Sequence, residues 1–162
     1  DQKDASLVTD YIHKNNFEKV AIISQTTMSV TGYKELINNI NNIFDDKFEN
    51  LHLSLKDMSS PFVFVDTICN PTKQRQSDTE EIAKKADIMV VIGGKNSSNS
   101  KELVAKSREL GVETYFIQNA GQVEKNWFDG KENIGVTAGA STPDVTINEV
   151  VDRIKEITNN RK

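Results

Sequence analysis

The sequence is short of cysteine, and this limits the chemistry that it can hold. Cys69 is the one cysteine among 162 residues, which excludes an internal disulfide. A single thiolate also cannot by itself form a metal site that requires several thiolates. Cys69 can therefore be at most one ligand of such a centre.

Long apolar runs and an excess of positive charge are missing as well. No run is long enough to span a bilayer, and residues 1–4 contain no apolar signal segment. The net charge is -4 and the pI is near 5.3, which gives no general attraction for nucleic acid or acidic membranes. We therefore expect a cytoplasmic protein that binds neither, in which any anion site is local.

Short apolar segments alternate with amphipathic ones along the whole chain. This alternation favours an α/β fold with mostly parallel strands and right-handed crossovers, arranged in two small parallel-sheet subdomains, residues 1–60 and 61–162. We expect strands at 20–23, 51–55 (weakly), 62–65, 88–92, 113–117 and 133–137. We expect helices at 4–15, 29–44, 72–86 and 123–128, another helix that ends at 110, and a closing helix that ends at 157. Helical spacing predicts buried faces with Leu7, Val8, Tyr11 and Ile12 in the first helix, and with Ile82 and Ala83 in the helix 72–86.

A polar stretch, Lys-Asn-Ser-Ser-Asn-Ser at 95–100, lies where the strand 88–92 passes through two glycines into a helix. Glycines allow close approach of the backbone, and the unpaired amides at a helix start attract phosphate or carboxylate. The hydroxyls and carboxamides add neutral donors. Helix capping explains Asn96, Ser97 or Ser98 taken singly, but the whole string indicates an anion site.

Three further polar segments follow predicted strands, at 25–27, 67–70 and 139–142. Parallel strands bring their carboxyl ends to one edge, where open α/β sheets bind ligands, so these segments suit a small phosphorylated ligand. Neither a Walker loop nor a dinucleotide fingerprint is present. Cys69 precedes a helix, a position that stabilises a thiolate. The alternative for Cys69 is a small buried hydrophobic residue.

Four segments together, in order along the chain, resemble one enzyme family. They are QTT at 25–27, TICN at 67–70 with Arg75–Gln76, GKNSSNS at 94–100 and GVTAGASTPD at 135–144. They are similar to 4-hydroxy-3-methylbut-2-enyl diphosphate reductase, the terminal enzyme of the methylerythritol phosphate route to isoprenoids. The likeness extends from Phe17 over nearly the whole chain, and its last two motifs are highly specific.

The resemblance implies a trefoil of three α/β subdomains around a 4Fe-4S cluster held by three cysteines, of which this chain has the two carboxyl-terminal subdomains. Cys69 looks like the third cluster ligand, and Thr26 matches the threonine beside the allylic hydroxyl of the substrate. The positions that hold the substrate diphosphate are matched by Ser97, Ser98, Asn99 and Ser141.

In that family two electrons and protons remove the hydroxyl as water, giving isopentenyl or dimethylallyl diphosphate, and a ferredoxin or flavodoxin would supply the electrons. The other two cluster cysteines, the substrate-facing histidines and the glutamate proton donor are absent here, and Pro71 replaces a small residue. We therefore expect a fragment of an oxidoreductase that binds no complete cluster and is inactive alone. The alternative is a non-catalytic phosphate- or diphosphate-binding module that lost the redox part.

Overall fold

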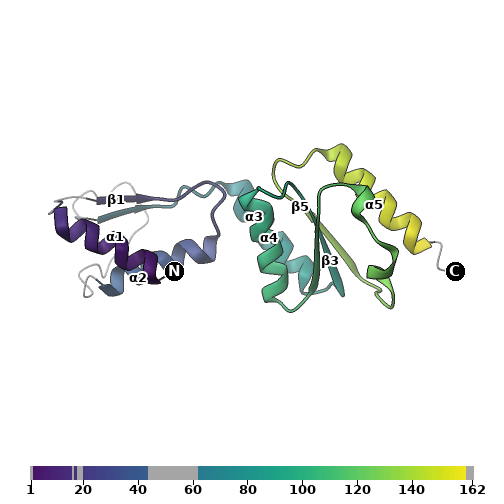
Figure 1. Ribbon diagram of the computed structural model, residues 1–162, viewed down its shortest axis with the longest axis horizontal. Coiled ribbons are helices and arrows are strands. Elements are labelled where there is room, and N and C mark those ends of the chain that lie inside the picture. The colour runs from purple at the N-terminus through teal and green to yellow at the C-terminus, as the bar shows by residue number, and fades with distance from the viewer. Residues whose placement is uncertain (1, 16, 18–19, 44–61, 160–162) are drawn as a thin grey trace. The chain divides into compact units, whose positions relative to one another are not determined.

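The computed structural model describes residues 2–15, 17, 20–43 and 62–159. The chain divides into two compact units, Asp1–Cys69 and Asn70–Lys162, which are named unit 1 and unit 2 and can be followed in Figure 1. The expected α/β class is confirmed. We had expected the division near residue 60, and it follows Cys69 instead because the strand Phe62–Val65 pairs within unit 1. The expected strand 51–55 lies outside the described residues.

The described residues of unit 1 form two helices and two parallel strands. The elements are α1 (Gln2–Asn15), β1 (Val20–Ile23), α2 (Val30–Ile43) and β2 (Phe62–Val65). Val20 lies opposite Phe62, and Ile23 lies opposite Val65. The buried apolar cluster takes Tyr33, Ile37 and Ile40 from α2, and these residues recur at helical spacing.

The buried face of α1 differs from the expected one. Ala5, Thr9 and Ile12 are buried, and they recur at helical spacing. Three residues expected on the inner face are exposed instead: Leu7 (62%), Val8 (40%) and Tyr11 (63%). The prediction was correct for Ile12 and wrong for the other three residues, because it followed the larger apolar side chains, whereas Ala5 joins the cluster formed by α2.

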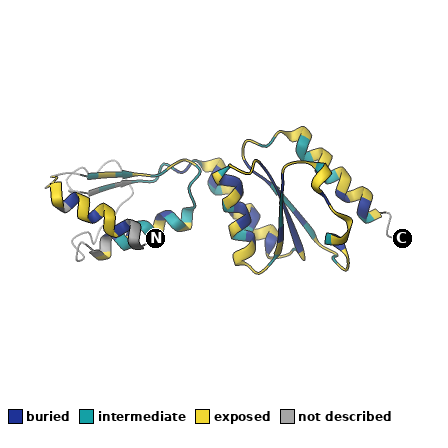
Figure 2. Cartoon of the chain, viewed as in Figure 1, coloured by how far each residue is buried: buried dark blue, intermediate teal, exposed yellow. Residues whose placement is uncertain are grey.

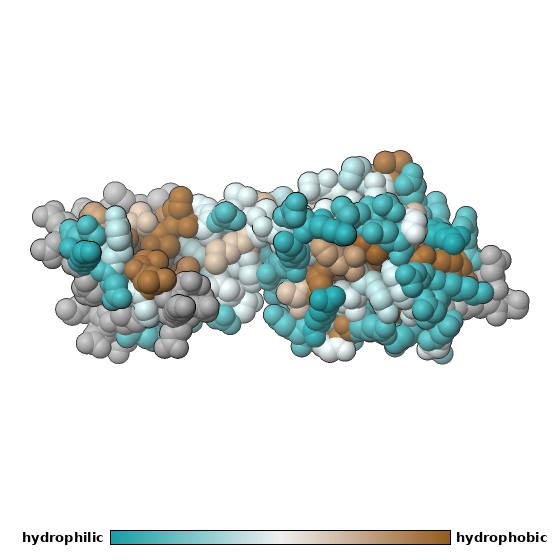
Figure 3. Space-filling model, in the orientation of Figure 1, coloured by the Kyte–Doolittle hydropathy of each residue, from teal (hydrophilic) through white to brown (hydrophobic). Residues whose placement is uncertain are grey.

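The exposed side of α1 forms part of an apolar hollow of about 770 Å³. Its lining includes Leu7, Tyr11 and Phe17, together with Ile23 from β1. Tyr11 and Phe17 contact each other with ring centroids 6.0 Å apart. Figure 3 shows apolar side chains gathered on this part of unit 1.

Unit 2 is a three-layer α/β structure around a parallel sheet with the order β4-β3-β5. Its elements are α3 (Asn70–Ala83), β3 (Ile88–Ile92), α4 (Ser98–Glu109), β4 (Glu113–Ile117), the 3-10 helices Ala120–Gln122 and Lys125–Phe128, β5 (Ile134–Ala138) and α5 (Asp144–Asn159). Helices α3 and α4 cover one face of the sheet, and α5 covers the other (Figure 1). The central strand β3 is buried along its whole length (Figure 2). None of the described helices is long and apolar enough to cross a membrane.

The inner face of α3 is largely polar. Thr72, Gln76 and Thr79 are buried with Ala83, whereas Ile82, expected inside, is 37% exposed. The hydroxyls of Thr79 and Thr137 hydrogen-bond to each other at 2.9 Å, which joins α3 to β5 and accounts for the burial of Thr79 on this face. The prediction was correct for Ala83 and wrong for Ile82.

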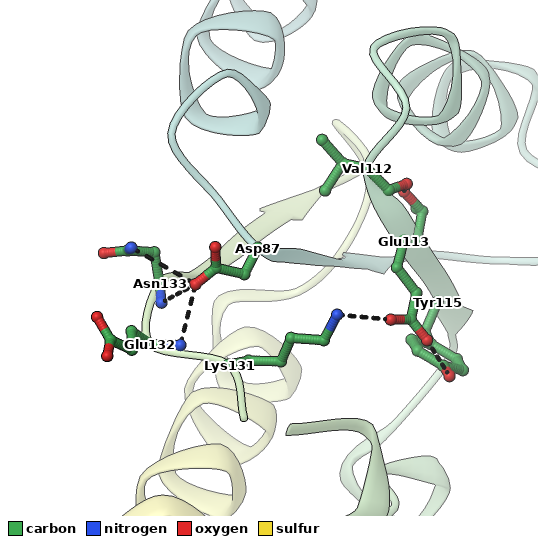
Figure 4. Close-up of polar contacts among 8 residues, drawn as sticks. Asp87, Val112, Glu113, Tyr115, Lys131, Glu132 and Asn133 are labelled. Carbon is green, nitrogen blue, oxygen red and sulfur yellow. Dashed lines mark hydrogen bonds and ion pairs between the residues drawn. The ribbon is translucent and has the colours of Figure 1, made fainter. Parts of the chain in front are cut away.

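The amino-terminal edge of the sheet in unit 2 is held by polar contacts, which Figure 4 shows in close-up. The Asp87 carboxylate accepts hydrogen bonds from the backbone N–H groups of Glu132 (2.9 Å) and Asn133 (2.8 Å). These bonds hold the pKa of Asp87 below its usual value. Lys131 pairs with Glu113 at 2.9 Å. This edge is therefore structural, and the opposite edge of this sheet carries two of the polar segments singled out in the sequence, 95–100 and 139–142.

Candidate functional site

In unit 1 the polar segments after β1 and β2 are held together by one hydroxyl. Thr67 Oγ1 accepts a hydrogen bond from the Ser24 amide at 3.0 Å, and it donates a short hydrogen bond to the Ser24 carbonyl. Two residues further along each segment, the amide of Cys69 donates to the carbonyl of Thr26 at 3.2 Å. The structure therefore places Thr26, which is exposed, beside Cys69, which is half-buried.

Tyr33 contacts the ends of both strands through its hydroxyl group. Its hydroxyl donates to the carbonyl of Val65 at 2.8 Å, and the side chain is 3% exposed. Burial, and secondarily the charge of Asp66, raises the pKa of Tyr33 above its usual value. The phenol stays protonated near neutral pH and remains a hydrogen-bond donor, so its role here is structural.

In unit 2 the start of α4 has the features of a helix terminus that can bind an anion. Ser97 caps the helix, since its Oγ accepts a hydrogen bond from the Ser100 amide at 3.2 Å. The amides of Ser98 and Asn99 precede the first intrahelical bond, which runs from Lys101 to the carbonyl of Ser97. The first turn has no acidic side chain. The amide dipoles therefore present positive potential without competition from a carboxylate.

Asn99 is the most unusual side chain at this terminus. It is 3% exposed, yet neither its Nδ2 nor its Oδ1 has a hydrogen-bond partner in the part of the chain that the structure describes. An unpaired buried amide is costly, and such groups in native structures call for an explanation. A bound anion would accept from Nδ2, so this side chain points to a ligand beyond the helix terminus itself.

The loop after β5 lies against the start of α4. A Cβ atom at Gly139 would lie 2.1 Å from Ser100 Oγ, and one at Gly93 would lie 2.2 Å from the same oxygen. Both glycines are therefore required by close approach. Thr142 Oγ1 donates to the carbonyl of Ile92 at 3.1 Å, which ties this loop to the end of β3.

Ser141 belongs to the same loop and is exposed. Arg75 supports the start of this loop, because its guanidinium donates to the carbonyl of Ala138 at 3.0 Å. Within unit 2 the structure thus brings the loop of Ser141 next to the segment Ser97–Asn99. Thr26 and Cys69 form a second group, which belongs to unit 1.

Sequence reasoning did not single out Ser100, Thr67 or Arg75 as supports of these segments. Both Ser100 and Thr67 lie inside the polar segments. Thr67 pairs with Ser24, which is distant in the sequence, whereas Ser100 pairs with Ser97 of the same segment. The usable signal was the glycine at the end of β3 together with the glycine after β5, because two glycines at neighbouring strand ends indicate a side chain packed between them.

The donor set for a metal is incomplete in this chain. Among the described residues no group of three or more His, Cys, Asp or Glu side chains could hold a metal ion. A 4Fe-4S cluster takes several cysteine thiolates, and Cys69 is the one cysteine of the sequence. The residues present therefore do not fit a complete cluster.

Comparison with known proteins identifies the family. The family described as LytB protein matches residues 2–155. The chain belongs to the LytB family. Curated LytB relatives include proteins named 4-hydroxy-3-methylbut-2-enyl diphosphate reductase from Campylobacter concisus, 42% identical over 140 residues, and from Aquifex aeolicus, 38% identical over 140 residues.

The LytB chain spans less than half the length of these relatives. The matched region is 86% of this chain but 46% of the Campylobacter concisus protein and 43% of the Aquifex aeolicus protein. A solved structure of (E)-4-hydroxy-3-methyl-but-2-enyl diphosphate reductase aligns with a TM-score of 0.55 and 34% identity, over 91% of this chain and 47% of that one. The Plasmodium falciparum reductase aligns with a TM-score of 0.71 over 85% of this chain and 39% of that one, and at 23% identity it supports the fold alone.

Proposed function

We propose that this chain is a fragment of a 4-hydroxy-3-methylbut-2-enyl diphosphate reductase and provides most of its diphosphate-binding surface. The reaction of the parent would take two electrons and two protons, release the allylic hydroxyl as water and give isopentenyl or dimethylallyl diphosphate. The observation that carries the proposal is the uncommitted amide of Asn99, buried at the first turn of α4. Membership of the LytB family supports the same substrate class.

The diphosphate would be held mainly by neutral donors. The backbone amides of Ser98 and Asn99, the side-chain amide of Asn99 and the hydroxyls of Ser97 and Ser98 would donate to its oxygens. Ser141 would donate from the adjoining loop. These groups suit a diphosphate because its oxygens accept hydrogen bonds, and the first turn of α4 carries no acidic residue to repel it.

Thr26 and Cys69 would belong to the redox side of the parent enzyme. Thr26 would contact the allylic hydroxyl of the substrate, and Cys69 would be one thiolate ligand of a 4Fe-4S cluster whose other ligands this chain lacks. A ferredoxin or flavodoxin would be the electron donor of the parent, and its place would be the cytoplasm. Since the donor set is incomplete, the chain alone would bind no cluster and would not turn over.

Titration calorimetry on the folded 162-residue chain tests the site. We expect inorganic pyrophosphate and the substrate diphosphate to bind weakly and to compete with each other. Asn99→Ala and Ser141→Ala should each reduce the affinity, whereas Ser107→Ala, which changes a buried serine elsewhere on α4, should leave it unchanged. A folded wild-type chain that gives no heat with either diphosphate would contradict the proposal.

A second candidate function is a non-catalytic diphosphate-binding module, favoured by the single cysteine of this sequence. The two functions differ in what the gene encodes before Asp1. An upstream segment in the same reading frame with two further cysteines supports the reductase. A start codon immediately before Asp1 supports the module.

A further inference from the structure

We infer that Ser100 is a positioning residue that fixes the hydroxyl of Ser97 as a hydrogen-bond donor toward the bound anion. The inference rests on the proposed function for its ligand, and on geometry alone for the hydrogen bonds. Ser100 lies in the first turn of α4, is 1% exposed and cannot reach a ligand itself. It would therefore act through Ser97.

Both acceptor positions of Ser97 Oγ are occupied by the same residue. The Ser100 amide donates to it at 3.2 Å, and the Ser100 hydroxyl donates to it at 3.0 Å. A serine hydroxyl has two lone pairs and one hydrogen. With both lone pairs engaged, Ser97 can only donate in the remaining direction.

The hydrogen of Ser97 has no acceptor within the part of the protein that the structure describes, and the side chain is half-buried. A hydroxyl without partners can rotate, so it can accept a hydrogen bond from a ligand donor or donate one to a ligand acceptor. A hydroxyl whose lone pairs are both filled suits a ligand oxygen that only accepts, such as one of a fully deprotonated diphosphate. Ser100 thereby sets the hydrogen-bond polarity of the site.

Two glycines hold Ser100 in this arrangement. Its Oγ lies 2.2 Å from the position of a Cβ on Gly93 and 2.1 Å from that of a Cβ on Gly139. The hydroxyl is enclosed between the end of β3 and the loop after β5, so little room remains for it to turn away from Ser97. The same contact connects the donor of Ser97 to the loop that carries Ser141.

A double-mutant cycle on pyrophosphate affinity tests the inference. We expect Ser100→Ala to weaken binding by about threefold to tenfold and Ser97→Ala to weaken it by about tenfold or more. In the Ser97→Ala background the further change Ser100→Ala should alter the affinity by less than about twofold, because its effect passes through Ser97. An equal loss in both backgrounds, or no loss in the wild-type background, would overturn the inference.

Ser107→Ala is the matched control for packing. Ser107 is also a buried serine of α4, with 0% exposure, and its hydroxyl donates to the Leu103 carbonyl at 2.9 Å. We expect this variant to lose stability comparably to Ser100→Ala while its pyrophosphate affinity stays within about twofold of wild type. A loss of affinity equal to that of Ser100→Ala would show that packing of α4, and not the bond to Ser97, determines binding.

Hydroxyl exchange measured by NMR separates this inference from the proposed function. In mixed light and heavy water, a slowly exchanging serine hydroxyl splits the signal of its own Cβ. We expect a split signal for Ser100 in the wild-type chain and a merged signal in Ser97→Ala. If pyrophosphate does not bind, the proposed function fails while this readout still decides the bond between the two serines. A merged signal in the wild-type chain would overturn the inference.

Discussion

The two glycines around Ser100 give the sharpest prediction about the stability of unit 2. A Cβ at Gly139 would meet Ser100 Oγ at 2.1 Å, whereas the Ser100 Cβ would be 3.4 Å away, an ordinary contact. At Gly93 the corresponding distances are 2.2 Å and 2.8 Å, both of which are severe clashes. The clash at Gly139 therefore involves a hydroxyl alone, and the clash at Gly93 also involves an atom fixed to the backbone of α4.

Overpacking a core site costs about 1–3 kcal/mol. We expect Gly139→Ala to lower the free energy of unfolding by about 1–2 kcal/mol, because only the Ser100 hydroxyl must move. Gly93→Ala should cost about 2–3 kcal/mol or more, because the start of α4 must shift. Neither glycine has a positive φ angle, so alanine causes no backbone strain that would obscure the comparison.

Ser100→Ala then distinguishes the two sites. Removing the hydroxyl eliminates the 2.1 Å contact, so adding Gly139→Ala to Ser100→Ala should cost less than about 0.5 kcal/mol. The 2.8 Å contact with Cβ persists in alanine, so Gly93→Ala should remain destabilising by about 1–2 kcal/mol in that background. The quantity to measure is how far Ser100→Ala reduces the destabilisation by Gly139→Ala, compared with how far it reduces that by Gly93→Ala.

Urea unfolding followed by tryptophan fluorescence is the assay. Trp127 is the one tryptophan of the sequence, and it stacks on Tyr115 in unit 2 with ring centroids 3.9 Å apart and an interplanar angle of 9°. Its signal therefore reports this unit. If Gly139→Ala is as destabilising with Ser100→Ala as without it, or if Ser100→Ala rescues both glycine variants equally, the close-approach reasoning is refuted.

Three further predictions concern polar groups of unit 2. The pKa of Asp87 is lowered by hydrogen bonds to its carboxylate, so its stabilising effect should be present above about pH 4 and be lost as the pH falls through its folded-state pKa. Asp87→Asn should lower the urea midpoint at pH 7 and reduce the change of that midpoint between pH 7 and acidic pH. A midpoint that falls with pH as steeply as in the wild type would contradict this. Thr79→Val or Thr137→Val should each cost about 1–2 kcal/mol by leaving a hydroxyl unpaired, whereas the double variant should recover much of the loss in the same unfolding assay. Asn99→Leu should raise the free energy of unfolding by about 1 kcal/mol while abolishing the heat of pyrophosphate binding, and a destabilised variant would show that this amide is satisfied within the protein.

The sequence predicted the α/β class and most element positions because the apolar segments are short, distinct and separated by glycine or polar residues. The strand 88–92 is a run of apolar residues, and in the structure it is the fully buried centre of the sheet. Helix α4 ends shortly before Gly111, whose φ angle of +77° is a conformation that favours glycine. Boundaries therefore differ by a few residues at most in unit 2.

Helix faces were predicted less well because hydropathy does not show which neighbour a helix meets. Leu7 and Tyr11 have larger side chains than Ala5 and Thr9, yet the smaller pair is buried. The same limit applies to α3, where Thr79 is buried by a hydroxyl contact with β5. In both helices the buried face is determined by contacts with residues far away in the sequence. A single sequence read by itself carries no signal for such contacts.

The sequence predicted that the candidate site residues share one edge. The structure shows them in two groups, one in each unit, and the supports of each group were not predicted. The rule that parallel strands end at one edge places Thr26 with Cys69 in unit 1, and Ser97 with the loop of Ser141 in unit 2. It cannot show which hydroxyl of a polar string faces the ligand and which is buried. In the segment 95–100, exposure and hydrogen bonding assign Ser98 to the surface and Ser100 to the interior.

The acidic composition of the chain is compatible with the proposed anion site in unit 2 for a structural reason. A net charge of -4 would oppose diphosphate binding at long range, but screening limits that effect to about 8–10 Å at ordinary ionic strength. At shorter range the amides at the start of α4 and the amide of Asn99 act without a counter-ion. Holding these donors uncommitted costs stability, and Ser100, packed between two glycines, lies in the same helical turn. The proposed anion site would thus be a local property of one helix terminus and its neighbouring loop, independent of the overall charge.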